Sequence, residues 1–225
     1  MSQTLPNPAR FAHIEAALID LDGTLVDTLG DFDVALNRTL SELGLPRVDT
    51  AAIRERVGKG SPHLVASVLD CIGASQTQYF DAAWALYQRH YEAVNGEHAH
   101  VYPGVREGLD AFRARGWKLA CLTNKPVAAA RDLLQRKQLD GYFEQVFGGD
   151  SFERRKPDPL PLLKTCEALG TKPERTLMVG DSSNDAQAAR AAGCPVWLLS
   201  YGYNHGEPIH AVDADGVVDS IAQLS

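Results

Sequence analysis

Residues 14–28 constrain the fold of this chain more than any other stretch. An apolar run rich in Ala, Leu and Ile stops at two aspartates, Asp20 and Asp22, and Gly23 and Thr24 follow at once. A short run that is apolar throughout is typical of a parallel strand buried on both faces. Because open α/β sheets bind ligands beyond the carboxyl ends of their strands, we expect both aspartates to lie at a binding crevice.

Two carboxylates one residue apart repel each other unless a cation lies between them or one of them holds a proton. The pair can therefore hold a divalent metal ion, or one aspartate can attack while the other transfers a proton. The alternative is a simple turn at a strand end, because Asp and Gly favour turns for local reasons.

The composition narrows the range of functions. The 225 residues suffice for one domain with a sizeable insertion, and 44% hydrophobic and 23% charged content is that of an ordinary globular protein. The net charge of −7 argues against nucleic acid as a main partner. No apolar stretch approaches the roughly 20 residues needed to span a bilayer, and residues 1–13 indicate a short mobile lead-in rather than a signal peptide.

Cysteine usage bears on the compartment. Cys71, Cys121, Cys166 and Cys194 are widely scattered and form no C-x-x-C pair. Disulfide and zinc frameworks need closer patterns, so we expect buried free thiols and a cytoplasmic protein without a membrane partner.

The character of the chain changes twice. Residues 29–98 predict helices without strands. Thr50 is expected to cap a short helix through Val57, and further helices are expected to start at Ser61 and Thr77. Beyond Val101 helices alternate with strands; the strands are expected at 117–122, 143–147, 176–180 and 195–199. This alternation implies βαβ crossovers. We expect an α/β fold, a Rossmann-like parallel sheet with helices on both faces, formed by residues 1–28 and 99–225, and an inserted all-helical module formed by residues 29–98.

Two further strand ends carry groups suited to an anion. Thr123 and Asn124 follow strand 117–122, where a hydroxyl and an amide can donate hydrogen bonds to an anion or merely cap the next helix. Lys156 precedes Pro157-Asp158-Pro159, whose prolines stiffen the loop. Its ammonium can neutralise Asp20 and a bound phosphate, or it is simply solvated.

Asp181 and Asp185 follow strand 176–180, four residues apart. Asp181 is placed as an oxygen ligand for Mg²⁺, and Asp185 can orient a metal-bound water or pair with Lys156. All these groups converge on one edge of the predicted sheet. Such a set can hold Mg²⁺ and a phosphoryl group together, and phosphoryl transfer needs little beyond positioning and charge neutralisation.

The four strand-end stretches resemble, in the same order, the four motifs of the haloacid dehalogenase-like hydrolases. They are Asp20-Leu-Asp22-Gly23-Thr24, Leu122-Thr123-Asn124-Lys125, Lys156-Pro-Asp-Pro and Gly180-Asp181-Ser-Ser-Asn-Asp185. The helical module after the first motif resembles the small cap of one branch of that superfamily. Val57-Gly-Lys-Gly60 and the stretch 201–209 are most similar to bacterial phosphoglycolate phosphatases.

This resemblance implies a Mg²⁺-dependent phosphatase that acts on a small phosphate monoester, first of all 2-phosphoglycolate. Asp20 would attack phosphorus to form an aspartyl-phosphate, and Asp22 would be general acid and then base. Lys156 would neutralise charge. The phosphoryl group would be bound by Thr123, the backbone amide of Asn124 and Gly23, and the metal by Asp20, the backbone carbonyl of Asp22 and Asp181, with Asp185 in support.

The cap would choose the substrate. Lys59 lies in a glycine loop between two predicted cap helices and can meet a substrate carboxylate when the cap closes. Many related proteins have asparagine at this position, and the alternative is an ordinary surface lysine.

Other functions remain open at this level: a phosphatase for a sugar or amino-sugar phosphate, a pyrophosphatase, a phosphoglucomutase, or a phosphate-binding protein without turnover. Gly180 stands where a mutase usually has an acidic residue, which argues against the mutase. A binding protein predicts a broken catalytic set, and a response-regulator receiver lacks the inserted helices. The protein is expected to be a monomer or a homodimer.

Overall fold

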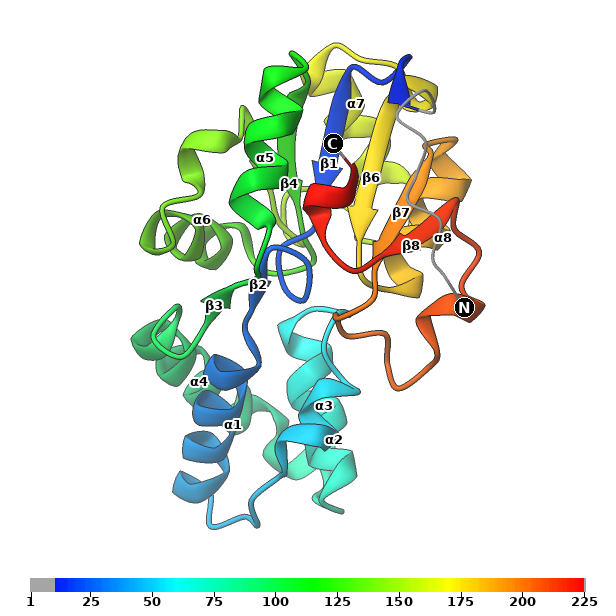
Figure 1. The fold of residues 1–225 in the computed structure, drawn as a ribbon. Coiled ribbons are helices and arrows are strands. Elements are labelled where there is room, and N and C mark those ends of the chain that lie inside the picture. The colour runs from blue at the N-terminus through cyan, green and yellow to red at the C-terminus, as the bar shows by residue number, and fades with distance from the viewer. Residues whose placement is uncertain (1–10, 225) are drawn as a thin grey trace.

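The computed structural model describes residues 11–224. A six-stranded sheet with the order β5-β4-β1-β6-β7-β8 forms its centre, and every neighbouring pair of strands is parallel (Figure 1). The strands are β1 (Ala16–Ile19), β4 (Lys118–Leu122), β5 (Gln145–Phe147), β6 (Thr176–Gly180), β7 (Val196–Leu199) and β8 (Gly216–Val218). The expected α/β fold with a parallel sheet is confirmed.

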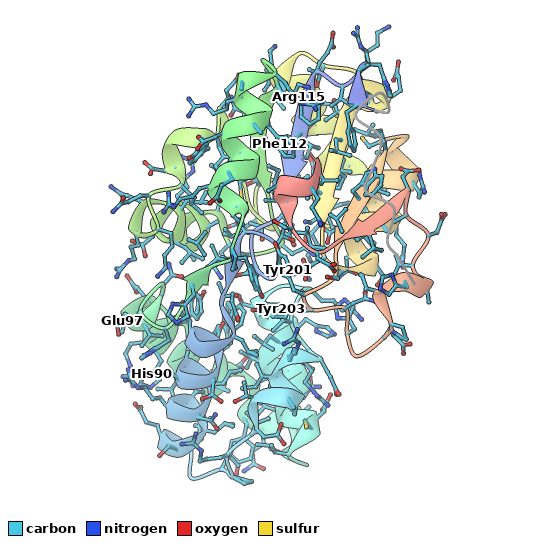
Figure 2. The ribbon with its side chains drawn as sticks, viewed as in Figure 1. His90, Glu97, Phe112, Arg115, Tyr201 and Tyr203 are labelled. Carbon is cyan, nitrogen blue, oxygen red and sulfur yellow. The ribbon has the colours of Figure 1, made fainter. Side chains whose placement is uncertain are left out.

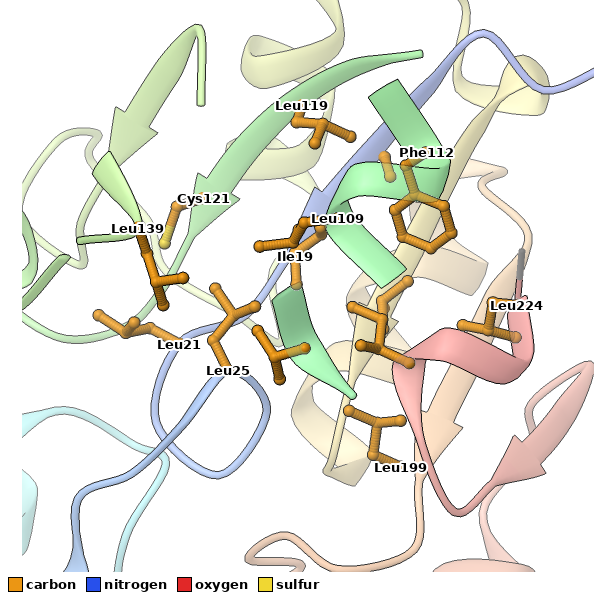
Figure 3. Packing of buried hydrophobic residues seen from close by; sticks show 14 of the residues in the cluster. Ile19, Leu21, Leu25, Leu109, Phe112, Leu119, Cys121, Leu139, Leu199 and Leu224 are labelled. Atoms are coloured by element: carbon orange, nitrogen blue, oxygen red, sulfur yellow. The ribbon is translucent and has the colours of Figure 1, made fainter. Parts of the chain in front are cut away.

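Helices cover both faces of this sheet. They are α5 (Val105–Ala114), α6 (Val127–Arg136), α7 (Leu160–Leu169) and α8 (Ser183–Ala192). Alternate residues of β1 point to opposite faces: Ile19 packs with Leu109 and Phe112 of α5, whereas Leu18 packs with residues of α7 and α8. Figure 3 shows the α5 side of this packing. Both faces of β1 are therefore apolar, which explains its uninterrupted hydrophobic sequence.

Four helices form a separate layer, residues 29–98, which we call the cap; we call the remaining described residues the core. The helices are α1 (Leu29–Glu42), α2 (Thr50–Arg54), α3 (Ser61–Cys71) and α4 (Gln76–Val94). They enclose a hydrophobic cluster of their own, with Phe32, Leu36, Tyr87 and Tyr91 among its members. The chain enters and leaves the cap through a two-stranded antiparallel ribbon, β2 (Val26–Asp27) and β3 (His100–Val101).

Several details differ from the sequence-based expectations. The N-cap of α2 is Asp49, whose carboxylate accepts a hydrogen bond from the amide of Ala52 at 2.7 Å, so Thr50 is the first helical residue rather than the cap. Helix α4 begins at Gln76, one residue before Thr77. The short strands β2, β3 and β8 were not predicted.

Two further expectations need correction. Of the proposed lead-in, residues 1–10 lie outside the described part of the chain, but Phe11 is buried between the rings of Trp117 and Trp197. All four cysteines are free, as expected, but Cys71 is exposed rather than buried. Within residues 11–224, no helix is both long and apolar enough to cross a membrane.

Candidate active site

Three aspartates meet at the carboxyl edge of the sheet. Asp20 follows β1, Asp181 follows the adjacent strand β6, and Asp185 lies in the first turn of α8. One carboxylate oxygen of each lies within 4.8 Å of the others, and all three side chains are buried. Neighbouring parallel strands therefore bring together carboxylates that are 165 positions apart between first and last.

The ammonium of Lys156 lies among these carboxylates. Its Nζ is 3.1 Å from Oδ1 of Asp20 and 2.7 Å from Oδ1 of Asp185, and it donates a third contact to the carbonyl of Leu122 at 2.7 Å. The side chain is only 2% exposed. The predicted neutralisation of Asp20 and the predicted pairing with Asp185 thus occur together.

Burial sets the electrostatics of the cluster. It raises the pKa of Asp20 to about 7, with help from the carboxylates of Asp185 and Asp22 and against the opposing effect of Lys156. Burial, Asp185 and Asp20 also raise the pKa of Asp181. Burial alone would lower the pKa of Lys156, but the carboxylates of Asp185 and Asp20 outweigh it and raise that pKa above its usual range. Lys156 is therefore a fixed positive charge.

Hydrogen bonds fix the orientation of Asp181. Its Oδ1 accepts from the hydroxyl of Thr24 at 2.8 Å, and its Oδ2 accepts from the amide of Tyr203 at 2.6 Å. The turn after β1 approaches closely: a Cβ at Gly23 would lie 2.3 Å from Oδ2 of Asp181, and Gly23 has a φ of +85°. Glycine at position 23 is required on both counts.

Asp185 has a second task besides its ion pair with Lys156. Its Oδ2 accepts hydrogen bonds from the amide and hydroxyl of Ser182, which closes a capping box at the start of α8. Both oxygens of Asp185 are therefore engaged within the cluster, and its support of a bound metal stays a prediction.

Asp22 points to a different partner. Its Oδ1 lies 2.8 Å from Nζ of Lys125, and its side chain is not one of the three carboxylates that cluster at the edge of the sheet. The metal contact expected of Asp22 involves its backbone carbonyl, and that prediction is unaffected.

Asp20, Asp22, Thr123 and Asn124 line one cavity of ≈ 30 Å³, together with Lys125 and cap residues such as Phe32 and Gly58. The side-chain amide of Asn124 donates to the carbonyls of Gly58 in the cap and Lys156 in the core, both at 2.9 Å. The amide of Asn124 thus holds the cap loop against the core. The cavity is therefore formed by residues of both core and cap.

Lys59 is exposed and is not among the residues that line this cavity. Its charge acts on the neighbouring rings of His63 and His205: burial first, and then Lys59, lowers the pKa of each. The structure therefore places Lys59 at the cap–core seam and leaves a contact with substrate as a prediction.

Sequence reasoning missed three residues that the site uses: Thr24, Lys125 and Tyr203. Lys125 stands in the motif Leu122-Thr123-Asn124-Lys125, three residues after β4, and a lysine so near the end of a buried strand was a signal in itself. The contacts of Tyr203 come from a loop 22 residues beyond Asp181, and no local pattern reveals them. Tyr201 and Tyr203 lie at the junction of cap and core (Figure 2).

Comparison with known proteins agrees with this geometry. Residues 14–193 match the family model described as haloacid dehalogenase-like hydrolase. The chain belongs to the haloacid dehalogenase-like hydrolases. It is 46% identical over 214 residues to a phosphoglycolate phosphatase of Nitrosospira multiformis and 44% identical to one of Thiobacillus denitrificans, each over 94% of both chains.

A solved structure gives the same result. The crystal structure of a predicted phosphoglycolate phosphatase from Haemophilus somnus superimposes with a TM-score of 0.91 at 32% identity, over 95% of this chain and 97% of that chain. The family resemblance expected from the four motifs is confirmed.

Proposed function

We propose that this member of the haloacid dehalogenase-like hydrolases is a Mg²⁺-dependent phosphoric monoester hydrolase that converts 2-phosphoglycolate to glycolate and phosphate. The observation that carries the proposal is the state of Asp20. Its carboxylate lines the cavity, and its buried Oδ1 lies 3.1 Å from the ammonium of Lys156. A carboxylate held at a cavity by a fixed ammonium is suited to attack phosphorus.

The residues present fit a divalent cation. Four carboxylates and two ammonium groups meet here, so with every group ionised two negative charges are in excess. A dianionic phosphoryl group binds poorly to such a site unless a cation compensates. Hard oxygen ligands are those that Mg²⁺ prefers. Asp20, Asp181 and the backbone carbonyl of Asp22 would hold the ion, which would neutralise charge on the phosphoryl oxygens.

The chain's own residues would then act in two steps. A carboxylate oxygen of Asp20 attacks phosphorus, the ester P–O bond breaks, and Asp22 gives a proton to the leaving alkoxide. Asp22 next takes a proton from water, whose oxygen attacks the phosphorus of the aspartyl-phosphate and frees Asp20. Thr123 and the backbone amide of Asn124 bind phosphoryl oxygens throughout, and Lys156 offsets their charge.

The similar proteins of Nitrosospira multiformis and Thiobacillus denitrificans are named phosphoglycolate phosphatases, which supports 2-phosphoglycolate as the substrate. A mutase is disfavoured on steric grounds, because a Cβ at Gly180 would lie 2.3 Å from Cγ of Asp185 and no acidic side chain fits there. The free cysteines support a cytoplasmic location.

Phosphate release from a substrate panel tests the proposal. The panel contains 2-phosphoglycolate, sugar phosphates, an amino-sugar 6-phosphate, pyrophosphate and an aryl phosphate, each with Mg²⁺ and with EDTA. We expect the highest kcat/KM for 2-phosphoglycolate, and no phosphate release from any compound with EDTA. A preference for a bulkier ester would overturn the substrate, and no release from any compound would favour a phosphate-binding protein.

A further inference from the structure

Lys125 is a buried lysine to which the proposed chemistry assigns no role. It follows the anion-binding turn after β4, and its side chain is 1% exposed. Its Nζ lies 2.8 Å from Oδ1 of Asp22, and that is the one hydrogen bond its ammonium makes among the described residues. A fully desolvated ammonium with one carboxylate partner fixes that carboxylate strongly.

The other neighbours of this ammonium are two aromatic rings. Nζ lies 4.9 Å from the ring centroid of Phe32 and 4.7 Å from that of Tyr91. A cation over an aromatic face is attracted to the ring, most strongly where water is excluded. Lys125 is thus held between the general acid Asp22 on one side and a pair of rings on the other.

The rings belong to the cap, whereas Lys125 and Asp22 belong to the core. Phe32 lies on α1 and Tyr91 on α4, and the two rings stack with centroids 5.5 Å apart. Both are members of the cap's hydrophobic cluster, so they move with the cap as a unit. The chain connects the cap to the core through the ribbon of β2 and β3, whose strands are two residues long each. Opening the cap therefore removes the rings and admits water to Lys125.

We infer that Lys125 is a positioning residue that holds Asp22 toward the leaving-group oxygen only while Phe32 and Tyr91 cover it. The general acid is then in place when the cap is closed over the substrate and released when the cap opens. This rests on the proposed function, in which Asp22 protonates the leaving alkoxide. Lys125 also lines the cavity, as Asp22 does.

Leaving-group dependence tests the inference. An alkyl ester needs a proton from Asp22, whereas 4-nitrophenyl phosphate has a leaving group that departs without one. In Lys125→Met we expect kcat/KM to fall by about 10²-fold for both 2-phosphoglycolate and ethyl phosphate, and by less than about three-fold for 4-nitrophenyl phosphate, since kcat/KM ends at phosphoryl transfer to Asp20. Lys164→Met, on an exposed lysine of α7, is the matched control.

Three other patterns of kcat/KM would overturn the inference. An equal fall on all three substrates would indicate a structural role, and a fall confined to 2-phosphoglycolate would indicate a contact with the substrate carboxylate. An unchanged kcat/KM on every substrate would also contradict it. The wild-type enzyme is measured first; if it hydrolyses no alkyl ester, the proposed function fails, independently of Lys125.

A second variant acts from the cap side. Phe32→Leu keeps the cap's cluster apolar and removes one ring from the ammonium. We therefore expect the same selective fall in kcat/KM on alkyl esters, but a smaller one than in Lys125→Met. Phe80→Leu, in the same cluster but without a contact to Lys125, is the control. If Phe32→Leu lowered kcat/KM equally on alkyl and aryl esters, the ring of Phe32 would not act through Asp22, and the inference would be wrong.

Discussion

Asp20 combines a strand-end position with burial among three other carboxylates. Its raised pKa, about 7, means that the folded protein holds this group ionised at a free-energy cost. We therefore expect Asp20 to serve the reaction rather than stability.

Replacement of the nucleophile separates these two roles. In Asp20→Asn we expect kcat for 2-phosphoglycolate to fall by more than about 10³-fold, while the melting temperature at about pH 8 is equal to or above that of the wild type because a costly charge is gone. Steady-state kinetics and thermal unfolding measure both. Substantial remaining activity would exclude Asp20 as nucleophile.

Three of the residues that sequence alone predicted share one property: they directly follow a strand of the central sheet. Asp20, Thr123 and Asp181 could be placed together because parallel strands end at one edge. Lys125 and Tyr203 could not be given roles in this way, because their partners, Phe32 and Asp27 among them, lie in elements whose packing no local pattern specifies.

At the scale of elements, the loop after β7 connects the cluster of Asp20, Asp181 and Asp185 to the ribbon of β2 and β3. The amide of Tyr203 binds Asp181, and its hydroxyl donates to Asp27 at 2.5 Å and accepts from the amide of Thr28 at 3.0 Å. Arg54 of the cap donates to the carbonyls of Tyr201 and Gly202. This loop therefore joins core, ribbon and cap through polar contacts.

Loss of the Tyr203 hydroxyl should destabilise the protein. Tyr203→Phe leaves the buried amide of Thr28 without its acceptor, at a cost of about 1–3 kcal/mol, which lowers the melting temperature by about 2–4 °C per kcal/mol. Calorimetry checks this, with Tyr79→Phe on α4 as control. A melting temperature equal to that of the wild type would contradict the assigned contacts.

The loop between α2 and α3 presents Lys59 to solvent at the seam. If it meets the substrate carboxylate on cap movement, Lys59→Ala should raise KM for 2-phosphoglycolate by up to about five-fold and leave KM for ethyl phosphate unchanged. Lys164→Ala serves as control. KM values that stay the same for both esters would remove Lys59 from substrate binding.

Longer apolar runs were predictable, and the shortest strands were not. Strand β6 at Thr176–Gly180 agrees with its predicted bounds, because an apolar run that stops at Asp181 marks it. The strands β2, β3 and β8 have two or three residues, too few for a period to show. The sequence therefore did not predict how the cap is connected to the core.

For the whole molecule, the buried carboxylates predict an unusual pH dependence of stability without metal. The pKa values of Asp20 and Asp181 are raised in the folded protein, so between about pH 4 and 7 it holds protons that the unfolded chain has released. The free energy of unfolding should therefore fall as pH rises through this window.

Thermal unfolding with EDTA and with Mg²⁺ checks this dependence. The effect of Asp20 is isolated by comparison with Asp20→Asn, which should show a smaller fall in melting temperature between about pH 5 and 8. Mg²⁺ should stabilise the wild type more at the higher pH, where the carboxylates are ionised and bind it. If the melting temperature of the wild type changed with pH as that of Asp20→Asn does, the raised pKa assigned to Asp20 would be wrong.

The central claim is that Asp20 carries the phosphoryl group during turnover, and peptide mapping tests it most directly. Wild-type protein is mixed with 2-phosphoglycolate and Mg²⁺, quenched with acid within the first turnovers, and digested for mass spectrometry, with Asp20→Asn treated in parallel. We predict a phosphorylated peptide with the modification on Asp20, absent from the variant, which releases no phosphate. A phosphoryl group on another residue, or phosphate release by Asp20→Asn at the wild-type rate, would contradict the mechanism.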